Sequence, residues 1–96
     1  MVKGIHESES WYYIPDASGY WVTKNRGTGR ALRLLLENMG NPVSLEEIER
    51  VSRWKHPRRD MRQQLTGIVN NWSDTLRIET SERNGQTHYT LYERKN

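Results

Sequence analysis

Six basic side chains gather in one short stretch of the chain, where they could together bind a polyanion. Between Arg50 and Arg62 the sequence has six Lys and Arg residues and a single acid, Asp60, which gives this stretch a net charge of +5. The whole chain has a formal charge of only +3, so the remainder carries −2. A local excess of this kind is typical of a surface that binds nucleic acid, although a basic helix face is also often simply solvated.

The basic stretch overlaps a helical pattern in residues 57–72. Apolar side chains recur there at helical spacing and share an arc of about 100° on a helical wheel. These apolar positions are Met61, Leu65, Ile68, Val69 and Trp72. The polar positions on or beside the other face are Arg59, Arg62, Gln63, Thr66 and Asn70, with Arg58 in the first turn. Pro57 suits the first helical position, and Gly67, which weakens a helix by about 1 kcal/mol relative to alanine, is expected to permit a close approach to another surface.

Two further helices are predicted before this one. They span residues 28–39 and 44–54. Thr28 is expected to cap the first helix, and Gly40 to end it in a left-handed conformation. Ser44 and Glu47 have the spacing of a capping box, in which each side chain bonds a backbone amide at the other position. The preceding segment NRGTGR lacks the lysine of a phosphate-binding loop and is predicted to be a linker.

A β-hairpin is predicted on each side of the helical region. In residues 10–23 two aromatic and β-branched runs flank PDASG, which has the composition of a turn. In residues 76–93 the pair Asn84-Gly85 favours a two-residue type I′ turn. That turn fixes a register in which one face carries Leu76, Ile78, Thr80, Tyr89 and Leu91.

The composition limits the class of protein. Ninety-six residues suit one domain, here residues 10–96, preceded by a flexible N-terminal segment at residues 1–9. Only 33% of the residues are hydrophobic and none is phenylalanine, so four Trp and five Tyr must supply much of the core. The absence of cysteine excludes disulfides, and three dispersed histidines do not suggest a zinc site. We expect a cytoplasmic protein without a membrane segment, a cofactor or enzymatic activity.

The order of three helices followed by a hairpin is that of the winged helix-turn-helix, an α+β fold, here with an additional N-terminal hairpin. The segment LRLLLENMGNPVSLEEIERVSRW resembles the first two helices and short strand of response-regulator effector domains of the OmpR/PhoB type. The segment IETSERNGQTHYTL resembles the wing of that family. The resemblance covers residues 10–93 and includes no receiver domain, so control by phosphorylation is not expected.

This resemblance implies that residues 57–72 form a recognition helix in the major groove of double-stranded DNA. Base contacts would then come from the outer face of the helix, and phosphate contacts from its entrance and from the wing tip. The implied DNA-binding residues are Lys55, His56, Arg58, Arg59, Arg62, Gln63, Thr66, Asn70, Arg83 and Asn84. The expected function is that of a small transcriptional regulator, acting as a dimer.

The aromatic N-terminal hairpin leaves two other functions open. A small domain can cover only one face of such a hairpin, so the other face is expected to meet a second copy, another protein or the bases of a single strand. The candidate partner surface consists of Trp11, Tyr13, Tyr20 and Trp21. The alternatives to duplex binding are therefore a protein–protein interaction module of a larger assembly and a single-stranded nucleic-acid binding protein.

Overall fold

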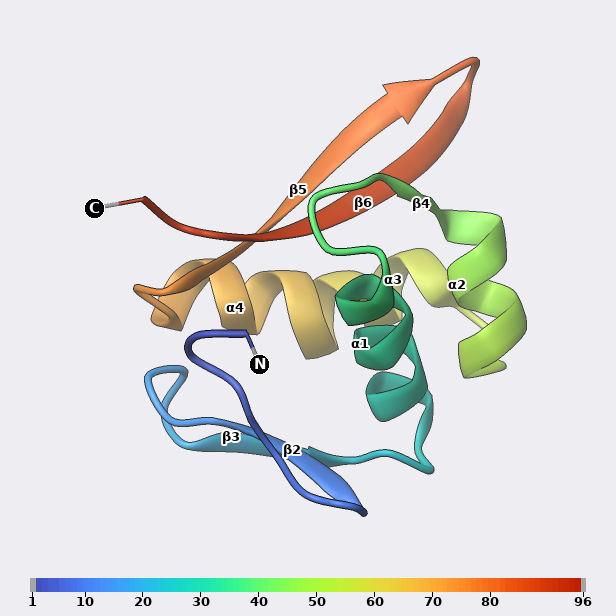
Figure 1. Ribbon diagram of the computed structural model, residues 1–96. Helices are drawn as coiled ribbons and strands as arrows, with labels where there is room; N and C mark the ends of the chain where they lie inside the picture. The colour runs from blue at the N-terminus through green and yellow to red at the C-terminus, as the bar shows by residue number, and fades with distance from the viewer. Residues whose placement is uncertain (1, 96) are drawn as a thin grey trace.

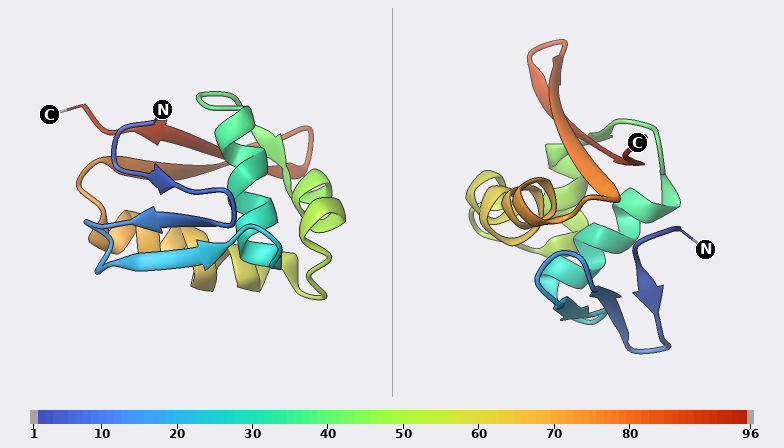
Figure 2. Two further views of the ribbon diagram at one scale, coloured as in Figure 1. Left: turned by 60° about the horizontal axis from the view of Figure 1, so that its bottom comes forward. Right: turned by 90° about the vertical axis from the view of Figure 1, so that its left-hand side faces the viewer.

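Three helices lie between two small antiparallel sheets in the computed structural model, which describes residues 2–95 (Figures 1 and 2). The first sheet has the order β1-β2-β3 and contains β1 (His6–Glu7), β2 (Trp11–Ile14) and β3 (Tyr20–Thr23). The second has the order β4-β6-β5 and contains β4 (Val43–Ser44), β5 (Leu76–Arg83) and β6 (Gln86–Glu93). The chain therefore has an α+β fold. No helix within residues 2–95 is long and apolar enough to cross a membrane.

The helical layer contains α1 (Gly27–Glu37), α2 (Leu45–Ser52) and one longer helix, residues 57–72. This longer helix, called helix 57–72 below, consists of α3 (Pro57–Met61), a π-helical turn η1 (Arg62–Thr66) and α4 (Gly67–Trp72). One continuous cluster of buried apolar residues joins all three helices to both sheets. Its largest fully buried side chains are Ile14, Leu32, Leu35, Ile48, Met61, Leu65, Leu76, Ile78, Leu91 and Val69.

The N-terminal segment, expected to be flexible, is instead part of the first sheet. His6 pairs with Tyr13 in β2, and Ile5 is only 3% exposed in the core. The backbone amide of Lys3 donates to a carboxylate oxygen of Glu93 at 3.0 Å, which ties this segment to the last strand. A short polar sequence can thus be ordered when one apolar residue within it has a core to join. Met1 and Asn96 lie outside the described residues.

The first helix confirms the predicted element but not its cap. α1 begins at Gly27, and the N-cap position belongs to Arg26, without a side-chain hydrogen bond. Thr28 lies inside the helix, where it is buried and its hydroxyl donates to the side-chain oxygen of Gln64. The prediction of Thr28 as the cap was therefore wrong, because this interhelical bond takes the hydroxyl. Gly40 does adopt a left-handed conformation, with φ of 82°, three residues after the helix ends.

The second helix has the predicted cap at its start and an unpredicted one at its end. Ser44 Oγ accepts the backbone amide of Glu47 at 3.1 Å, but the Glu47 carboxylate pairs with Arg50, so only half of the capping box forms. At the other end the guanidinium of Arg30, which lies in α1, donates to the Val51 carbonyl at 2.8 Å. A cation at that position satisfies free carbonyls and complements the helix dipole. Arg30 thereby fastens α2 to α1.

The C-terminal hairpin has the predicted bounds and register. Arg83 pairs with Gln86, and the two turn residues Asn84 and Gly85 have φ values of 53° and 75°, as a type I′ turn requires. Leu76, Ile78, Tyr89 and Leu91 are buried as expected. Thr80 lies on the same face but beyond the edge of the core, where it is exposed. This face of the hairpin therefore runs from the core out over open surface.

A carboxylate clamp joins the N-terminal hairpin to the start of β5. Asp16, in the turn between β2 and β3, accepts hydrogen bonds from the Ser73 hydroxyl at 3.0 Å and the Asp74 amide at 2.9 Å. The amide and hydroxyl of Thr75 also donate to it, at 3.1 and 3.0 Å. Burial alone would raise the pKa of Asp16, but these donors favour the charged form and lower the pKa below its ordinary value.

We expect Asp16→Asn to destabilise the fold by about 1–2 kcal/mol at neutral pH, because hydrogen bonds to a carboxylate are lost. A lowered native pKa stabilises the fold above the unfolded pKa, and this stability disappears as pH falls through the native value. The difference between the wild type and Asp16→Asn should therefore shrink below about pH 4, as measured by thermal unfolding across pH. Asp74→Asn, which alters an exposed neighbour, is the control; an equal loss in both variants would contradict the clamp.

Candidate functional site

The π turn in helix 57–72 changes which side chains face the core. Its buried residues Met61, Leu65 and Val69 are each 0% exposed and lie four positions apart. A π turn accommodates about one extra residue, which rotates everything after it by about 100° relative to a straight α-helix. Trp72, predicted to belong to the apolar stripe, is consequently 60% exposed. That prediction was wrong because the wheel assumed a uniform α-helix.

Gly67 is the residue that allows this turn. Its backbone amide donates to the Arg62 carbonyl, five residues earlier, as in a π-helix. A Cβ atom at position 67 would lie 2.5 Å from that same carbonyl oxygen, far inside van der Waals contact. A close approach therefore exists, but it is to the helix's own backbone and not, as expected, to another surface.

A groove with a volume of about 780 Å³ separates the first half of helix 57–72 from the C-terminal hairpin. It is lined by Leu45, Lys55, His56, Pro57, Arg58, Arg59, Arg62, Thr66, Thr80 and Tyr89. We call it the helix–hairpin groove. Of the ten predicted DNA-binding residues it brings together six, namely Lys55, His56, Arg58, Arg59, Arg62 and Thr66. All the charged side chains that line it are basic, so it offers a positive channel between two elements.

Two of the arginines in the groove are held by neighbours. Arg58 donates to the Thr87 hydroxyl of β6 at 2.9 Å, and Thr87 donates in turn to Glu82 at 2.7 Å. Arg59 contacts the carboxylate of the buried Asp60 at 3.2 Å. These contacts reduce the conformational freedom that the long side chains would lose on binding a ligand.

A polar network around Gln64 fixes the helix to the N-terminal half of the chain. Gln64 in the π turn donates to Asp60 at 3.4 Å and accepts from the Thr28 hydroxyl. The Tyr20 hydroxyl donates to the Gln64 carbonyl at 2.8 Å. Burial raises the pKa of Tyr20, so its hydroxyl remains a donor at neutral pH. This network was not predicted, because its members come from three separate elements and no local pattern connects them.

Asn70 does not belong to the site that was predicted for it. Its side-chain amide donates to the Ile78 carbonyl and accepts from the Ile78 amide, both at 2.8 Å. These two bonds imitate a neighbouring strand along the outer edge of β5. Nearby, Arg94 Nε donates to the Leu76 carbonyl at 2.9 Å and Ser73 Oγ accepts the Leu76 amide at 3.0 Å. A base could engage the Asn70 amide only after this strand edge had lost its partner.

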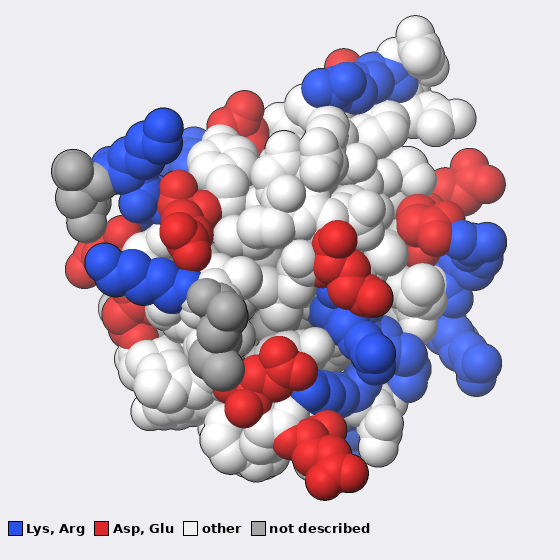
Figure 3. Space-filling view, viewed as in Figure 1, with Lys and Arg blue, Asp and Glu red and all other residues white. Residues whose placement is uncertain are grey.

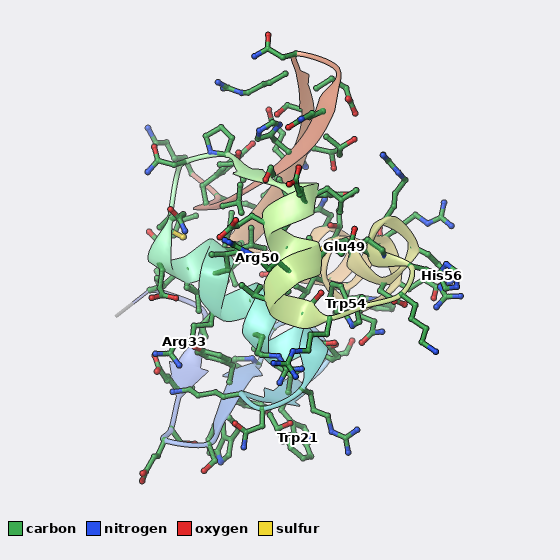
Figure 4. The ribbon with its side chains drawn as sticks, turned by 90° about the vertical axis from the view of Figure 1, so that its right-hand side faces the viewer. Trp21, Arg33, Glu49, Arg50, Trp54 and His56 are labelled. Atoms are coloured by element: carbon green, nitrogen blue, oxygen red, sulfur yellow. The ribbon has the colours of Figure 1, made fainter. Side chains whose placement is uncertain are left out.

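The other predicted DNA-binding residues are exposed but stand apart from the groove. Gln63 points to solvent beside Arg62 without lining the groove. Arg83 and Asn84 occupy the tip of the hairpin, which projects well away from the helices (Figure 1). Figure 4 shows His56 at the entrance of helix 57–72 on one side of the molecule and Arg33 on the other. The face shown in Figure 3 carries acidic and basic side chains interspersed.

The outer face of the first sheet is a second exposed feature, called the aromatic face below. Trp11 is 40% and Trp21 61% exposed, and Tyr13 lies directly opposite Trp21 in the ladder. His6 packs edge-on against Tyr13, with ring centroids 6.2 Å apart. Tyr20, predicted for this surface, faces the interior and bonds to Gln64 instead. Strand alternation dictates this correction, because Tyr20 precedes the outward-facing Trp21.

Residues 2–95 contain no group of three or more His, Cys, Asp or Glu side chains that could hold a metal ion. Comparison of the chain with protein-family models, with curated proteins and with solved structures found no match. The physical features of the helix–hairpin groove and of the aromatic face therefore carry the functional argument.

We expect Gly67→Ala to destabilise the protein by about 1–3 kcal/mol, since the new methyl group must displace the Arg62 carbonyl. At an ordinary helical glycine the same substitution would have the opposite effect and raise the free energy of unfolding by about 1 kcal/mol. Chemical denaturation followed by circular dichroism measures the difference. Gln63→Ala, an exposed position in the same turn, is the control and should change stability by less than about 0.5 kcal/mol. Stabilisation by Gly67→Ala would show that the π turn is not required.

Proposed function

We propose that the chain is a winged helix-turn-helix protein that binds double-stranded DNA and acts as a small transcriptional regulator. The observation that carries this proposal is the helix–hairpin groove, whose charged lining is entirely basic. Helix 57–72 would lie in the major groove as the recognition helix, with the β5–β6 hairpin as the wing. The order of α1, α2, helix 57–72 and the hairpin supports this assignment.

The contacts divide into two kinds under this proposal. Gln63 is exposed on the helix and has a side chain that can bond an adenine edge, and the exposed Arg59 and Arg62 flank it with guanidinium groups that can pair with guanine or with phosphate. Lys55, His56 and Arg58 lie at the entrance of the helix, where they would contact phosphates and fix its orientation. Arg83 at the hairpin tip would reach the backbone or the minor groove. A dimer of such units would bind half-sites about 10 base pairs apart, centre to centre.

A protein-interaction module is the second candidate, favoured by the aromatic face. Two exposed tryptophans on one small sheet are unusual on a surface that stays in water, and such residues are enriched at protein interfaces. Glu7 is paired with Lys24 and lies opposite the buried Tyr12, so the aromatic face itself offers neither a basic side chain for phosphates nor a free acid. A surface of aromatic rings without paired basic groups favours a protein partner, including a second copy of the chain, over single-stranded DNA or RNA.

Duplex binding is tested by fluorescence-anisotropy titration of a random-sequence duplex at several salt concentrations. We expect binding that weakens steeply with salt, because counterions are released from the phosphates. Arg59→Glu/Arg62→Glu should weaken binding at low salt at least about tenfold and reduce the slope of log affinity against log salt by about 2.

The matched control for that experiment is Arg33→Glu/Arg77→Glu. It makes the same change in net charge at two exposed arginines that do not line the groove. An equal loss of affinity in both double variants would indicate a diffuse charge effect rather than a groove. The absence of duplex binding by the wild type at low salt would overturn the proposed function.

The second candidate predicts self-association or partner binding through Trp21. If a second copy covers the aromatic face, sedimentation should show a mass that rises with concentration, and Trp21→Ala should abolish the rise. Trp72→Ala is the control, because Trp72 is equally exposed but lies at the end of helix 57–72. A monomer at all concentrations would exclude the second copy, and similar effects of both substitutions would show that the aromatic face is not the contact.

A further inference from the structure

One side-chain hydroxyl at the helix–hairpin groove lacks a hydrogen-bond partner. Thr66 Oγ1 is the one buried side-chain nitrogen or oxygen in residues 2–95 for which no partner is present. Threonine within a helix often bonds back to the carbonyl four residues earlier. That carbonyl belongs to Arg62, and Thr66 Oγ1 makes no hydrogen bond to it. A buried polar group without a partner lowers stability, so its presence calls for an explanation.

The surroundings of Thr66 indicate what the missing partner is. Thr66 lines the groove together with Arg62, one turn earlier, and with Arg59, Lys55 and His56. No acidic side chain lines the groove, so a bound cation or a basic peptide would meet only like charge. The matching ligand is an anion with several acceptor oxygens, which the arginines can pair with and a hydroxyl can donate to. Phosphate has this chemistry.

We propose that the helix–hairpin groove binds a phosphate group, with Thr66 donating its hydroxyl and Arg62 supplying the charge. In duplex DNA the group is a backbone phosphodiester, and this assignment of its source rests on the proposed function. In the free protein the hydroxyl is buried. Threonine has two accessible χ1 rotamers in a helix, so rotation about χ1 can turn the hydroxyl towards the groove. Thr66 is then a residue that weakens the free protein and strengthens the complex.

Tyr89 and Arg62 limit where this phosphate can lie. Tyr89 is 4% exposed and forms part of the wall on the hairpin side. Burial raises the pKa of Tyr89, so the wall carries a neutral hydroxyl rather than a phenolate that would repel an anion. Among the arginines that line the groove, Arg62 is the nearest in sequence to Thr66, four residues before it and in the same π turn. The phosphate position is therefore over the π turn, not at the first turn of the helix.

The test compares Thr66→Val and Thr66→Ser with the wild type in two measurements. Thermal unfolding without ligand measures how much stability the unpaired hydroxyl costs the free protein. Titration at constant ionic strength measures the affinity for the ligand. The probes are a random-sequence duplex and inorganic phosphate, with sodium chloride as the ionic-strength control. We expect Thr66→Val to raise Tm by roughly 4–8 °C and to weaken duplex binding by roughly tenfold or more. Thr66→Ser, which keeps the hydroxyl, should bind like the wild type.

Each other outcome separates the phosphate site from the proposed function. If the wild type binds duplex and Thr66→Val binds equally well, the phosphate site is wrong and duplex binding stands. If Thr66→Val lowers Tm without changing affinity, the hydroxyl has a structural partner and the phosphate site is again wrong. If the wild type binds no duplex, the proposed function fails. A stabilisation by inorganic phosphate that Thr66→Val abolishes would then still support the phosphate site, and its absence would overturn it.

Discussion

The rotation of helix 57–72 about its own axis decides which of its side chains are buried in the core and which face the groove. Met61, Leu65 and Val69 reach the core at a spacing of four because the π turn delays the rotation of the helix. The same delay leaves Arg62 and Thr66 beside the hairpin and turns Trp72 out to solvent. Gly67 makes the turn sterically feasible, so one residue without a side chain sets the arrangement of both faces. A π turn at this place in the fold fits the tendency of such turns to occur at functional sites.

Polar ties between layers compensate for the small number of apolar residues. Only 33% of the residues are hydrophobic, yet the two sheets and three helices are held in fixed positions relative to one another. Asp16 ties the first hairpin to the start of β5, Arg30 ties α1 to α2, and Asn70 ties helix 57–72 to β5. Each tie satisfies backbone groups that would otherwise be unpaired near the interior. Polar side chains of the kind that serve recognition are consequently used to hold the fold together.

Local signals predicted the elements of the fold, and their failures come from contacts between elements and from the π turn within helix 57–72. The register of the C-terminal hairpin follows from the Asn84-Gly85 turn, which needs only neighbouring residues. Thr28 and Asn70 were misassigned because their partners, Gln64 and Ile78, are distant in sequence or in another element. The basic groove was largely foreseeable from charge and helical spacing, whereas the π turn was not. Gly67 was the single sign of it, and a glycine in a helix is compatible with many causes.

The outer edge of β5 near the core is covered by side chains rather than by a strand. Asn70, Ser73 and Arg94 occupy the backbone groups of Leu76 and Ile78 that point away from β6. An exposed strand edge is a template on which other chains can add, leading to aggregation or strand exchange. Here the covered half of the edge is closed to such addition, while the half towards the tip, from Thr80 onwards, stays open. On β5, therefore, the part of the edge that remains open to strand addition is the part that borders the basic groove.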